Sequence, residues 1–146
     1  MSRYFEKVSY NDTGILPTRN DKASAGYDFY APKDIVIYPH EATKVITNIK
    51  ASMEQNEVLM LYVRSSIGVK KNLMLANGTG VVDSSFFNNP DNEGNIMIIL
   101  YNYSDKMQVI KEGERFAQGV FIKYLVTDDD KPLNEDRIGG IGSSGK

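Results

Sequence analysis

The hydrophobic positions of the chain fall into short runs, which are rich in Val, Ile, Tyr and Phe and bounded by Gly, Pro, Asn or Asp. Such runs are typical of β-strands. They predict strands over Tyr4–Tyr10, Asp34–Tyr38, Thr43–Ile49, Val58–Val63, Leu73–Leu75, Gly80–Val82, Asn95–Tyr103, Gln108–Ile110 and Arg115–Tyr124. Only Ser66–Lys71 has the pattern of a helical turn, with serine as its cap. Many short strands without helices between them favour an all-β sandwich, jelly roll or barrel.

Length and charge exclude several classes of protein. The 146 residues fit one domain, and a net charge of -2 gives no broad basic surface for nucleic acid. The chain has no cysteine and one histidine, which excludes disulfides and a histidine-rich metal site. No apolar run approaches the ~20 residues of a membrane span, and the N-terminal stretch lacks a signal-peptide core. We therefore expect an intracellular, cytoplasmic protein without nucleic-acid or membrane partners.

The apolar pattern stops near Asp128, where an acidic run and then a glycine-serine stretch begin. This predicts one domain over residues 1–127 and a flexible arm over 128–146. The arm spells GxGxxG and nearly a P-loop, but no strand precedes it and no helix follows, so neither nucleotide-binding motif is supported. Backbone N–H groups and hydroxyls of such a stretch still bind phosphate oxygens well, and Arg137 adds a cation nearby. The alternative is a tail without a role.

Polar side chains also occur at the ends of predicted strands. Arg64, Ser65 and Ser66 follow the apolar run VLMLY and precede the helical turn, which suggests either an anion site or a capped turn. Gln118 lies inside an apolar strand between small residues and faces either solvent or a ligand. Asp28 lies among aromatics, where a carboxylate usually has a structural role. Asp83 ends the run Val81-Val82, a costly place for a charge unless it is paired, solvated or functional.

Five of these segments, in this order, resemble the five signature motifs of the homotrimeric dUTPase family. They read AGYDF, RSS, NGTGVVDSSF, GERFAQ and RIGGIGSSG, and they span nearly the whole chain. The resemblance implies a jelly-roll subunit, which is a distorted β-barrel, with a glycine-rich C-terminal arm. It also implies a homotrimer with sites at the subunit interfaces, Mg²⁺ as cofactor, and hydrolysis of dUTP to dUMP and pyrophosphate.

The resemblance assigns the uracil and the deoxyribose to the third motif. Backbone groups of the hairpin, with the Asn77 side chain, would read the uracil edge, and the Phe86 ring would pack under the sugar. Asp83 would be the general base that directs water at the α-phosphorus. The residues implied for base and sugar are Asn77, Gly80, Val82, Asp83 and Phe86.

The other motifs would hold the phosphates and close the site. The phosphate-binding residues implied are Arg64, Ser65, Ser66, Gln118, Arg137, Gly142, Ser143 and Ser144. Gln118 and Asp28 join Asp83 as catalytic residues, Gln118 near the α-phosphate or the water, and Asp28 in support of the metal's waters or of arginine geometry. Mg²⁺ would bind mainly through phosphates and waters, without a direct protein ligand.

The chain departs from the family pattern in three places. Phe86 replaces the usual tyrosine, which keeps the shape of the ring. Ile141 replaces the aromatic lid over the base, and the arm is one residue shorter between Arg137 and Gly142, so we expect weaker lid closure. The segment NNPDNEG, residues 88–94, lengthens the loop after the third motif, either as a plain hairpin or as a surface for a protein partner.

Two rival functions share this fold. A dCTP deaminase would need a glutamate base and a pocket that accepts an amine, whereas the carboxylate here is Asp83. A regulatory module would bind the nucleotide and dock a protein through residues 88–94.

Overall fold

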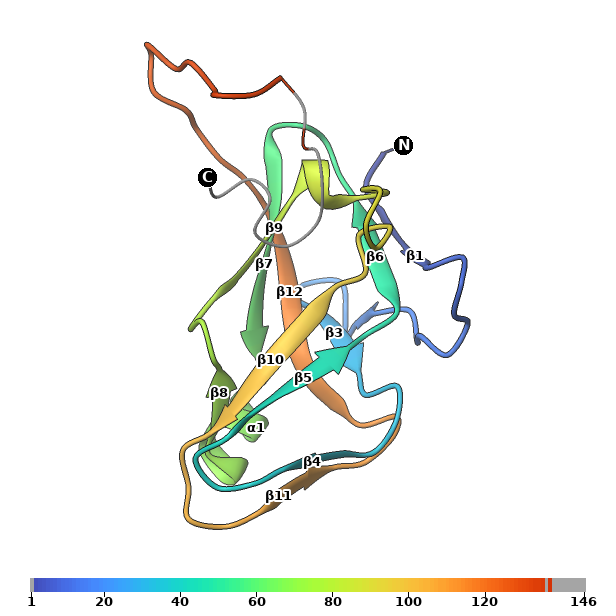
Figure 1. Cartoon of the computed structure of the whole chain (residues 1–146), viewed down its shortest axis with the longest axis vertical. Helices are drawn as coiled ribbons and strands as arrows, with labels where there is room; N and C mark the ends of the chain where they lie inside the picture. The colour runs from blue at the N-terminus through green and yellow to red at the C-terminus, as the bar shows by residue number, and fades with distance from the viewer. Residues whose placement is uncertain (1, 136, 138–146) are drawn as a thin grey trace.

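The computed structural model describes residues 2–135 and Arg137, and this part of the chain consists mainly of β-strands (Figure 1). The strands are β1 (Tyr4–Lys7), β2 (Thr18–Arg19), β3 (Tyr27–Tyr30), β4 (Ile35–Ile37), β5 (Ala42–Ile46), β6 (Ile49–Ser52), β7 (Glu57–Val63), β8 (Leu73–Leu75), β9 (Gly80–Asp83), β10 (Met97–Asn102), β11 (Gln108–Ile110) and β12 (Arg115–Lys123). The helical segments are α1 (Ser65–Lys71) and the 3-10 turn η1 (Ser84–Phe86).

The strands of the described part form antiparallel sheets that pack in layers. The largest sheet has the order β2-β3-β12-β7-β9, and a second has the order β5-β10-β8. Figure 1 shows β5 and β10 crossing in front of β3, β7 and β12. Phe29, Leu59 and Phe116 from the first sheet join Ile98 and Leu100 from the second in one buried cluster. The predicted all-β jelly roll is confirmed, and its sheets do not close into a barrel.

Three strands were not predicted: the two-residue β2, β3 and β6. Strand β3 has Asp28 and Phe29 buried side by side, so it lacks the alternation of polar and apolar residues that marks a half-exposed strand. The predicted strand Thr43–Ile49 is wrong as one element, because the chain breaks after Ile46 and restarts as β6. Asn48 causes the break: it has a φ of 60°, its side-chain oxygen accepts a hydrogen bond from Asn95 Nδ2, and its backbone N–H donates to Asn95 Oδ1.

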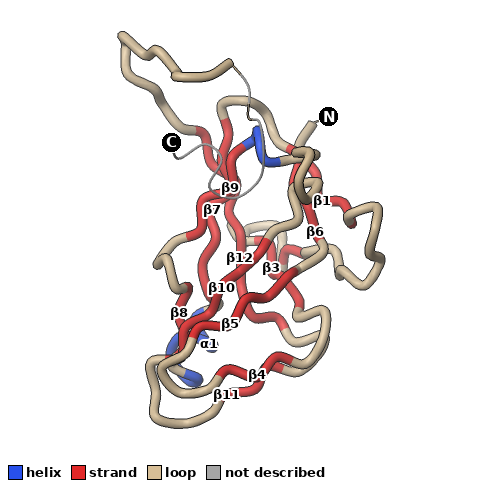
Figure 2. The backbone as a smooth tube through the Cα atoms, in the orientation of Figure 1, coloured by secondary structure: helices blue, strands red, loops and turns tan. Residues whose placement is uncertain are grey.

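The predicted helical turn is confirmed and extends one residue further toward the N-terminus, but the predicted serine cap is wrong, because the N-cap residue is Arg64 and makes no side-chain capping hydrogen bond. Helix α1 begins after Arg64, whose backbone is extended, and ends at Asn72 in the left-handed conformation. Ile67 anchors the helix in the core, and Lys70 and Lys71 lie in the last turn, where cations favour the helix dipole. Figure 2 shows α1 and η1, in blue, at opposite ends of the molecule.

The segment after β12 has no further strand up to residue 135, and no helix of the described part is long and apolar enough to cross a membrane. The arm residues Ile141, Gly142, Ser143 and Ser144 lie outside the described residues. The boundary between domain and arm at 127/128 stays a prediction.

Acid should weaken the fold through Glu93, which lies in the loop before β10. Hydrogen bonds from Lys50, and then from the side chain and backbone of Ser9, lower the pKa of Glu93 from 4.5 to about 2. The Lys50 ammonium also lies 3.6 Å from a second carboxylate, that of Glu6. A carboxyl group with a lowered folded-state pKa stabilises the protein above its unfolded pKa, and this contribution is lost as the pH falls.

We therefore expect the Tm to fall between pH 4.5 and about 2, the window set by the two pKa values of Glu93. Thermal melts across this range test the expectation. In the variant Glu93→Gln, which cannot titrate, the fall should be shallower than in the wild type. Equal slopes for the two proteins would contradict the assignment.

Candidate active site

A pocket of about 280 Å³ opens where β7, β9 and η1 meet the beginning of β10. Its apolar wall comes from β7, β8 and the β10 segment, and its polar groups are Asn77, Asp83 and Arg137. The volume is near the lower end of ligand pockets, ~300–1,000 Å³, and suits a ligand with one small ring system. All five residues that the sequence assigned to base and sugar line this pocket: Asn77, Gly80, Val82, Asp83 and Phe86.

The turn between β8 and β9 shapes one side of the pocket. The predicted hairpin is wrong, because β8 pairs with β10 and β9 pairs with β7 in different sheets. Gly78 turns the chain with a φ of 77°, and its N–H donates to the Leu75 carbonyl at 2.9 Å. A Cβ on Gly80 would lie 2.8 Å from the Leu61 Cβ, so glycine allows β9 to approach β7 closely. Because β9 is the edge strand of its sheet, the row of backbone groups that faces away from β7 is not used by the sheet. A planar ligand can therefore pair with the backbone of β9.

The alternation of β9 explains why a carboxylate follows two valines. Gly80 and Val82 point into the core, and Val81 and Asp83 point outward. Asp83 ends the strand and precedes η1, but its side chain makes no capping hydrogen bond to that turn. The side chain is 51% exposed, so the carboxylate lies at the rim of the pocket, where it can contact both water and a ligand.

Arg137 comes from the C-terminal segment and covers the same rim. Its Nη2 donates to Asp83 Oδ2 at 2.9 Å, and its Nε donates to Ser85 Oγ at 3.0 Å. The guanidinium lies 5.4 Å from the centre of the Phe86 ring, and the side chain is 8% exposed. The structure therefore places a cation of the arm next to the predicted base.

A second polar cluster lies around Asp28, which is 8% exposed on β3. Its two carboxylate oxygens lie 3.5 Å from Arg64 Nε and 3.4 Å from Arg115 Nη1. Strand pairing places Asp28 opposite Gln118 on β12, and Gln118 opposite Tyr62 on β7. The buried carboxylate fixes two guanidinium groups that together exceed its charge, so the cluster can bind an anion.

Arg115 is the member of this cluster that the sequence did not identify. It lies inside the quoted stretch GERFAQ, at the first residue of β12. The signal was present as an arginine at a strand start, but its partner Asp28 is 87 positions away. Ser65 and Ser66 start α1 directly after Arg64, and Ser65 is exposed.

The two clusters lie at opposite ends of β7. Asp83 pairs with Val58 near the start of that strand, whereas Arg64 directly follows its last residue, Val63. Arg64 lies six positions after Val58, which corresponds to about 20 Å at ~3.3 Å per residue. One copy of the chain therefore brings the residues of each cluster together but does not join the two clusters.

Known proteins resemble this chain over most of its length. A sequence model of the dUTPase family matches residues 12–145. The deoxyuridine 5'-triphosphate nucleotidohydrolase of Lactococcus lactis is 44% identical over 146 residues, covering 98% of this chain and 97% of that protein. The crystal structure of a dUTPase from Streptococcus mutans superimposes with a TM-score of 0.81 at 40% identity, over 86% of this chain and 99% of that one.

A more distant structure shares the fold. It is a mutant dUTPase from phage phi11 of S. aureus, described with a structural Mg(II) ion. Its TM-score is 0.74 at 20% identity, and the match covers 92% of this chain and 98% of that one.

Proposed function

Because this chain belongs to the dUTPase family and is a dUTP nucleotidohydrolase, we propose that dUTP binds in the pocket between β7, β9 and η1 and that Asp83 activates the attacking water. One observation carries the proposal: the half-exposed Asp83 carboxylate lies at the rim of a small pocket that also presents Asn77 and an edge strand. These are the parts needed to hold a pyrimidine and to position water beside its sugar.

Uracil would be recognised by β9 and the turn before it. The free backbone edge of β9 and the Asn77 amide offer donors and acceptors to the pyrimidine edge. Cytosine would leave polar groups unpaired at this edge, at a cost of roughly 1–3 kcal/mol each. The apolar wall would meet the bare C5 position of uracil and leave no room for the methyl group of thymine.

Deoxyribose would pack on Phe86. This ring lines the pocket next to Asp83 and is partly buried against the core, so its position is defined. A flat ring at this place leaves no room for a ribose 2′-hydroxyl, which would discriminate against UTP.

The chemical step would use Asp83 as a general base. One carboxylate oxygen accepts a proton from a water molecule while the water oxygen bonds to the α-phosphorus. The bond from that phosphorus to the bridging oxygen breaks, and pyrophosphate leaves with the electron pair. The Arg137 guanidinium, 2.9 Å from Asp83, would move to the phosphates when they arrive and so free the carboxylate for the water.

The phosphate chain would be held by a neighbouring copy of the chain. Arg64, which Ser65 and Ser66 follow directly, lies about 20 Å along β7 from Asp83, and Gln118, opposite Tyr62, lies about 13 Å along it. The linked phosphates of one nucleotide do not span the distance to Arg64. A site made from two copies resolves the separation, because the Asp28 cluster of one chain can face the pocket of the next. Closed rings of identical chains repeat such a contact at every interface, which agrees with the proposed homotrimer.

Mg²⁺ is the cofactor that the family implies. Within residues 2–135 and Arg137, no three His, Asp or Glu side chains form a cage for a metal, and Asp28 is engaged by two arginines. This donor set fits Mg²⁺ held through substrate phosphates and waters, its usual mode at phosphate sites. When bound, the ion would neutralise charge on the phosphate oxygens. The residues described above would still bind the nucleotide, orient its phosphates and deprotonate the attacking water.

The proposal is tested with purified protein and four nucleotides. We expect Mg²⁺-dependent release of dUMP and pyrophosphate from dUTP, with dCTP, dTTP and UTP hydrolysed at least about a hundredfold less efficiently. Conversion of dCTP to dUTP would support the deaminase alternative. Nucleotide binding without turnover would support the regulatory alternative.

Gly26 offers a separate test of Gln118. A Cβ on Gly26 would lie 2.5 Å from Gln118 Oε1, so alanine must displace the amide, which is the flexible end of its side chain. A hydrogen bond to a charged phosphate contributes about 1.5–3 kcal/mol, so Gly26→Ala should lower kcat/KM about ten- to a hundredfold while the Tm changes little.

A double variant tests whether the loss of kcat/KM in Gly26→Ala arises from displacement of Gln118. If Gly26→Ala acts through Gln118, then Gly26→Ala combined with Gln118→Ala should be no less active than Gln118→Ala alone. Additive losses in the kinetic assay would mean that Gly26 affects the site by another path.

A further inference from the structure

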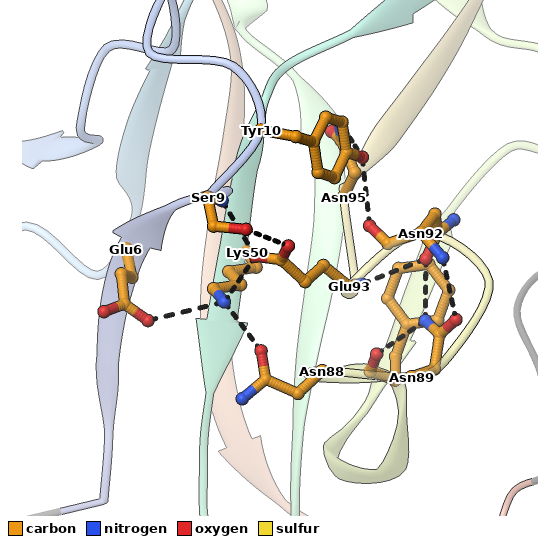
Figure 3. Close-up of polar contacts among 11 residues, drawn as sticks. Glu6, Ser9, Tyr10, Lys50, Asn88, Asn89, Asn92, Glu93 and Asn95 are labelled. Carbon is orange, nitrogen blue, oxygen red and sulfur yellow. Dashed lines mark hydrogen bonds and ion pairs between the residues drawn. The ribbon is translucent and has the colours of Figure 1, made fainter.

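Lys50 is a buried cation that the proposed reaction does not use. It lies on β6, and its side chain is 8% exposed. Its Nζ donates to Asn88 Oδ1 at 2.6 Å and to Glu93 Oε1 at 2.8 Å, and it lies 3.6 Å from Glu6 Oε1 (Figure 3). Burial of an ammonium group is costly unless it is paired. Two of its three partners belong to the loop of residues 88–94, so Lys50 fastens this loop to the sheet.

The loop is held in a single strained conformation. Asn88 and Glu93 have φ values of 57° and 65°, which residues other than glycine rarely adopt. The Asn88 N–H donates to the Glu93 carbonyl at 2.7 Å, which closes the loop. The Glu93 carboxylate also accepts hydrogen bonds from the backbone N–H and the hydroxyl of Ser9. Strained backbone persists where surrounding contacts over-determine it, and here Lys50 and Ser9 supply those contacts.

The loop in turn fixes Phe86. The Phe86 carbonyl accepts hydrogen bonds from the Asn89 backbone N–H at 3.3 Å and from Asn89 Nδ2 at 2.8 Å. Lys50 Nζ also lies 5.1 Å from the centre of the Phe87 ring, which follows directly. On its other side, η1 continues from Asp83, which strand pairing holds to β7. The backbone of Phe86 is therefore held by the sheet on one side and by the Lys50-bound loop on the other.

We propose that Lys50, together with Glu93, is a positioning residue for Phe86 and thereby sets discrimination between deoxyribose and ribose. This inference rests on the proposed function, because it assigns the sugar to Phe86. UTP differs from dUTP by one hydroxyl, so rejection by contact requires a ring that cannot retreat. The Asn88, Asn89 and Glu93 side chains bond within the chain, which favours this role for the loop over docking of a protein partner.

The variant Lys50→Met tests the inference, because it keeps a long side chain and removes the charge. The ratio of kcat/KM for dUTP to that for UTP should fall about tenfold or more, since the ring can then yield to the 2′-hydroxyl. The ratio for dUTP to dCTP should change less than about twofold, because the interactions of Lys50 are with Glu6, Asn88, Glu93 and Phe87 and not with β9 or the turn before it, which would read the base. If Lys50 only stabilises the fold, Lys50→Met should lower the Tm and change neither ratio.

Two further variants keep the outcome decisive. Ile110→Ala removes buried volume on β11, which pairs with β4, and supplies the matched loss of Tm without loss of discrimination. Glu93→Gln weakens the ion pair with Lys50 and should also lower the dUTP-to-UTP ratio. It tests the inference if Lys50→Met does not fold. An unchanged dUTP-to-UTP ratio in the folded variants would overturn the inference while wild-type turnover of dUTP upholds the proposed function. Absence of that wild-type turnover would overturn the proposed function and this inference with it.

Discussion

Replacement of Asp83 by asparagine should lower kcat for dUTP hydrolysis about 10²–10⁴-fold, the contribution usual for a positioned base. Asparagine has the size of aspartate and retains an oxygen that accepts hydrogen bonds, but it does not take a proton from water. Because Asp83 is 51% exposed at the pocket rim and makes no capping bond to η1, the change should leave the fold intact. Steady-state kinetics with purified protein measure the loss.

A binding measurement distinguishes a catalytic base at Asp83 from a carboxylate that only maintains the structure of the site. Calorimetry with a non-hydrolysable dUTP analogue should give a Kd within about fivefold of the wild type, because the ground-state contacts of base and sugar remain. Asp105→Asn is the matched control, since Asp105 is an exposed carboxylate that pairs only with His40 among the interactions seen. It should show wild-type kinetics. Turnover near the wild-type rate in Asp83→Asn would remove Asp83 from the role of base.

Two inactive variants should restore each other's activity when they are mixed. Asp83→Asn removes the base and Arg64→Gln removes a phosphate ligand, and these residues lie about 20 Å apart along β7 in one chain. If each site takes Asp83 from one copy and Arg64 from the next, then random 1:1 assembly leaves about one quarter of the sites complete. Co-refolding of equal amounts, followed by the dUTP assay, should therefore recover about one quarter of the refolded wild-type activity.

The reciprocal mixture provides the control. Wild-type chains refolded with the double variant Asp83→Asn/Arg64→Gln should give about one quarter of full activity from two-chain sites, but about one half from single-chain sites. No recovery from the first mixture, together with one half from the second, would show that each chain carries its own complete site. Each variant refolded alone gives the baseline.

Local sequence patterns identified the pocket well because its parts are adjacent in the chain. The five residues implied for base and sugar fall within ten consecutive positions: Asn77, Gly80, Val82, Asp83 and Phe86. The turn before β9, β9 itself and the 3-10 turn η1 bring them to the same cavity. Strand alternation alone places Asp83 outward after the inward Val82. A short contiguous motif therefore carries enough geometry to predict a site.

The features that the sequence missed depend on partners far along the chain. Arg115 reads as an ordinary strand-end arginine until β3 brings Asp28 beside it. In the sequence, Lys50 has the pattern of a solvent-facing residue, and it makes β6 look too polar for a buried strand. Its burial depends on the ion pair with Glu93, which lies 43 positions away and is not visible in the local pattern. The sequence therefore left open whether residues 88–94 form a plain hairpin, whereas the structure shows a loop fastened to the sheet.

In the proposed reaction, water directed by a carboxylate next to the sugar pocket attacks the phosphorus nearest the sugar. Hydrolysis of dUTP by the wild-type protein in H₂¹⁸O, followed by mass spectrometry of both products, tests it most directly. Attack at the α-phosphorus predicts that dUMP gains one ¹⁸O atom and that pyrophosphate gains none. Label in pyrophosphate and not in dUMP would mean attack at the β-phosphorus, away from Asp83, and would contradict the account.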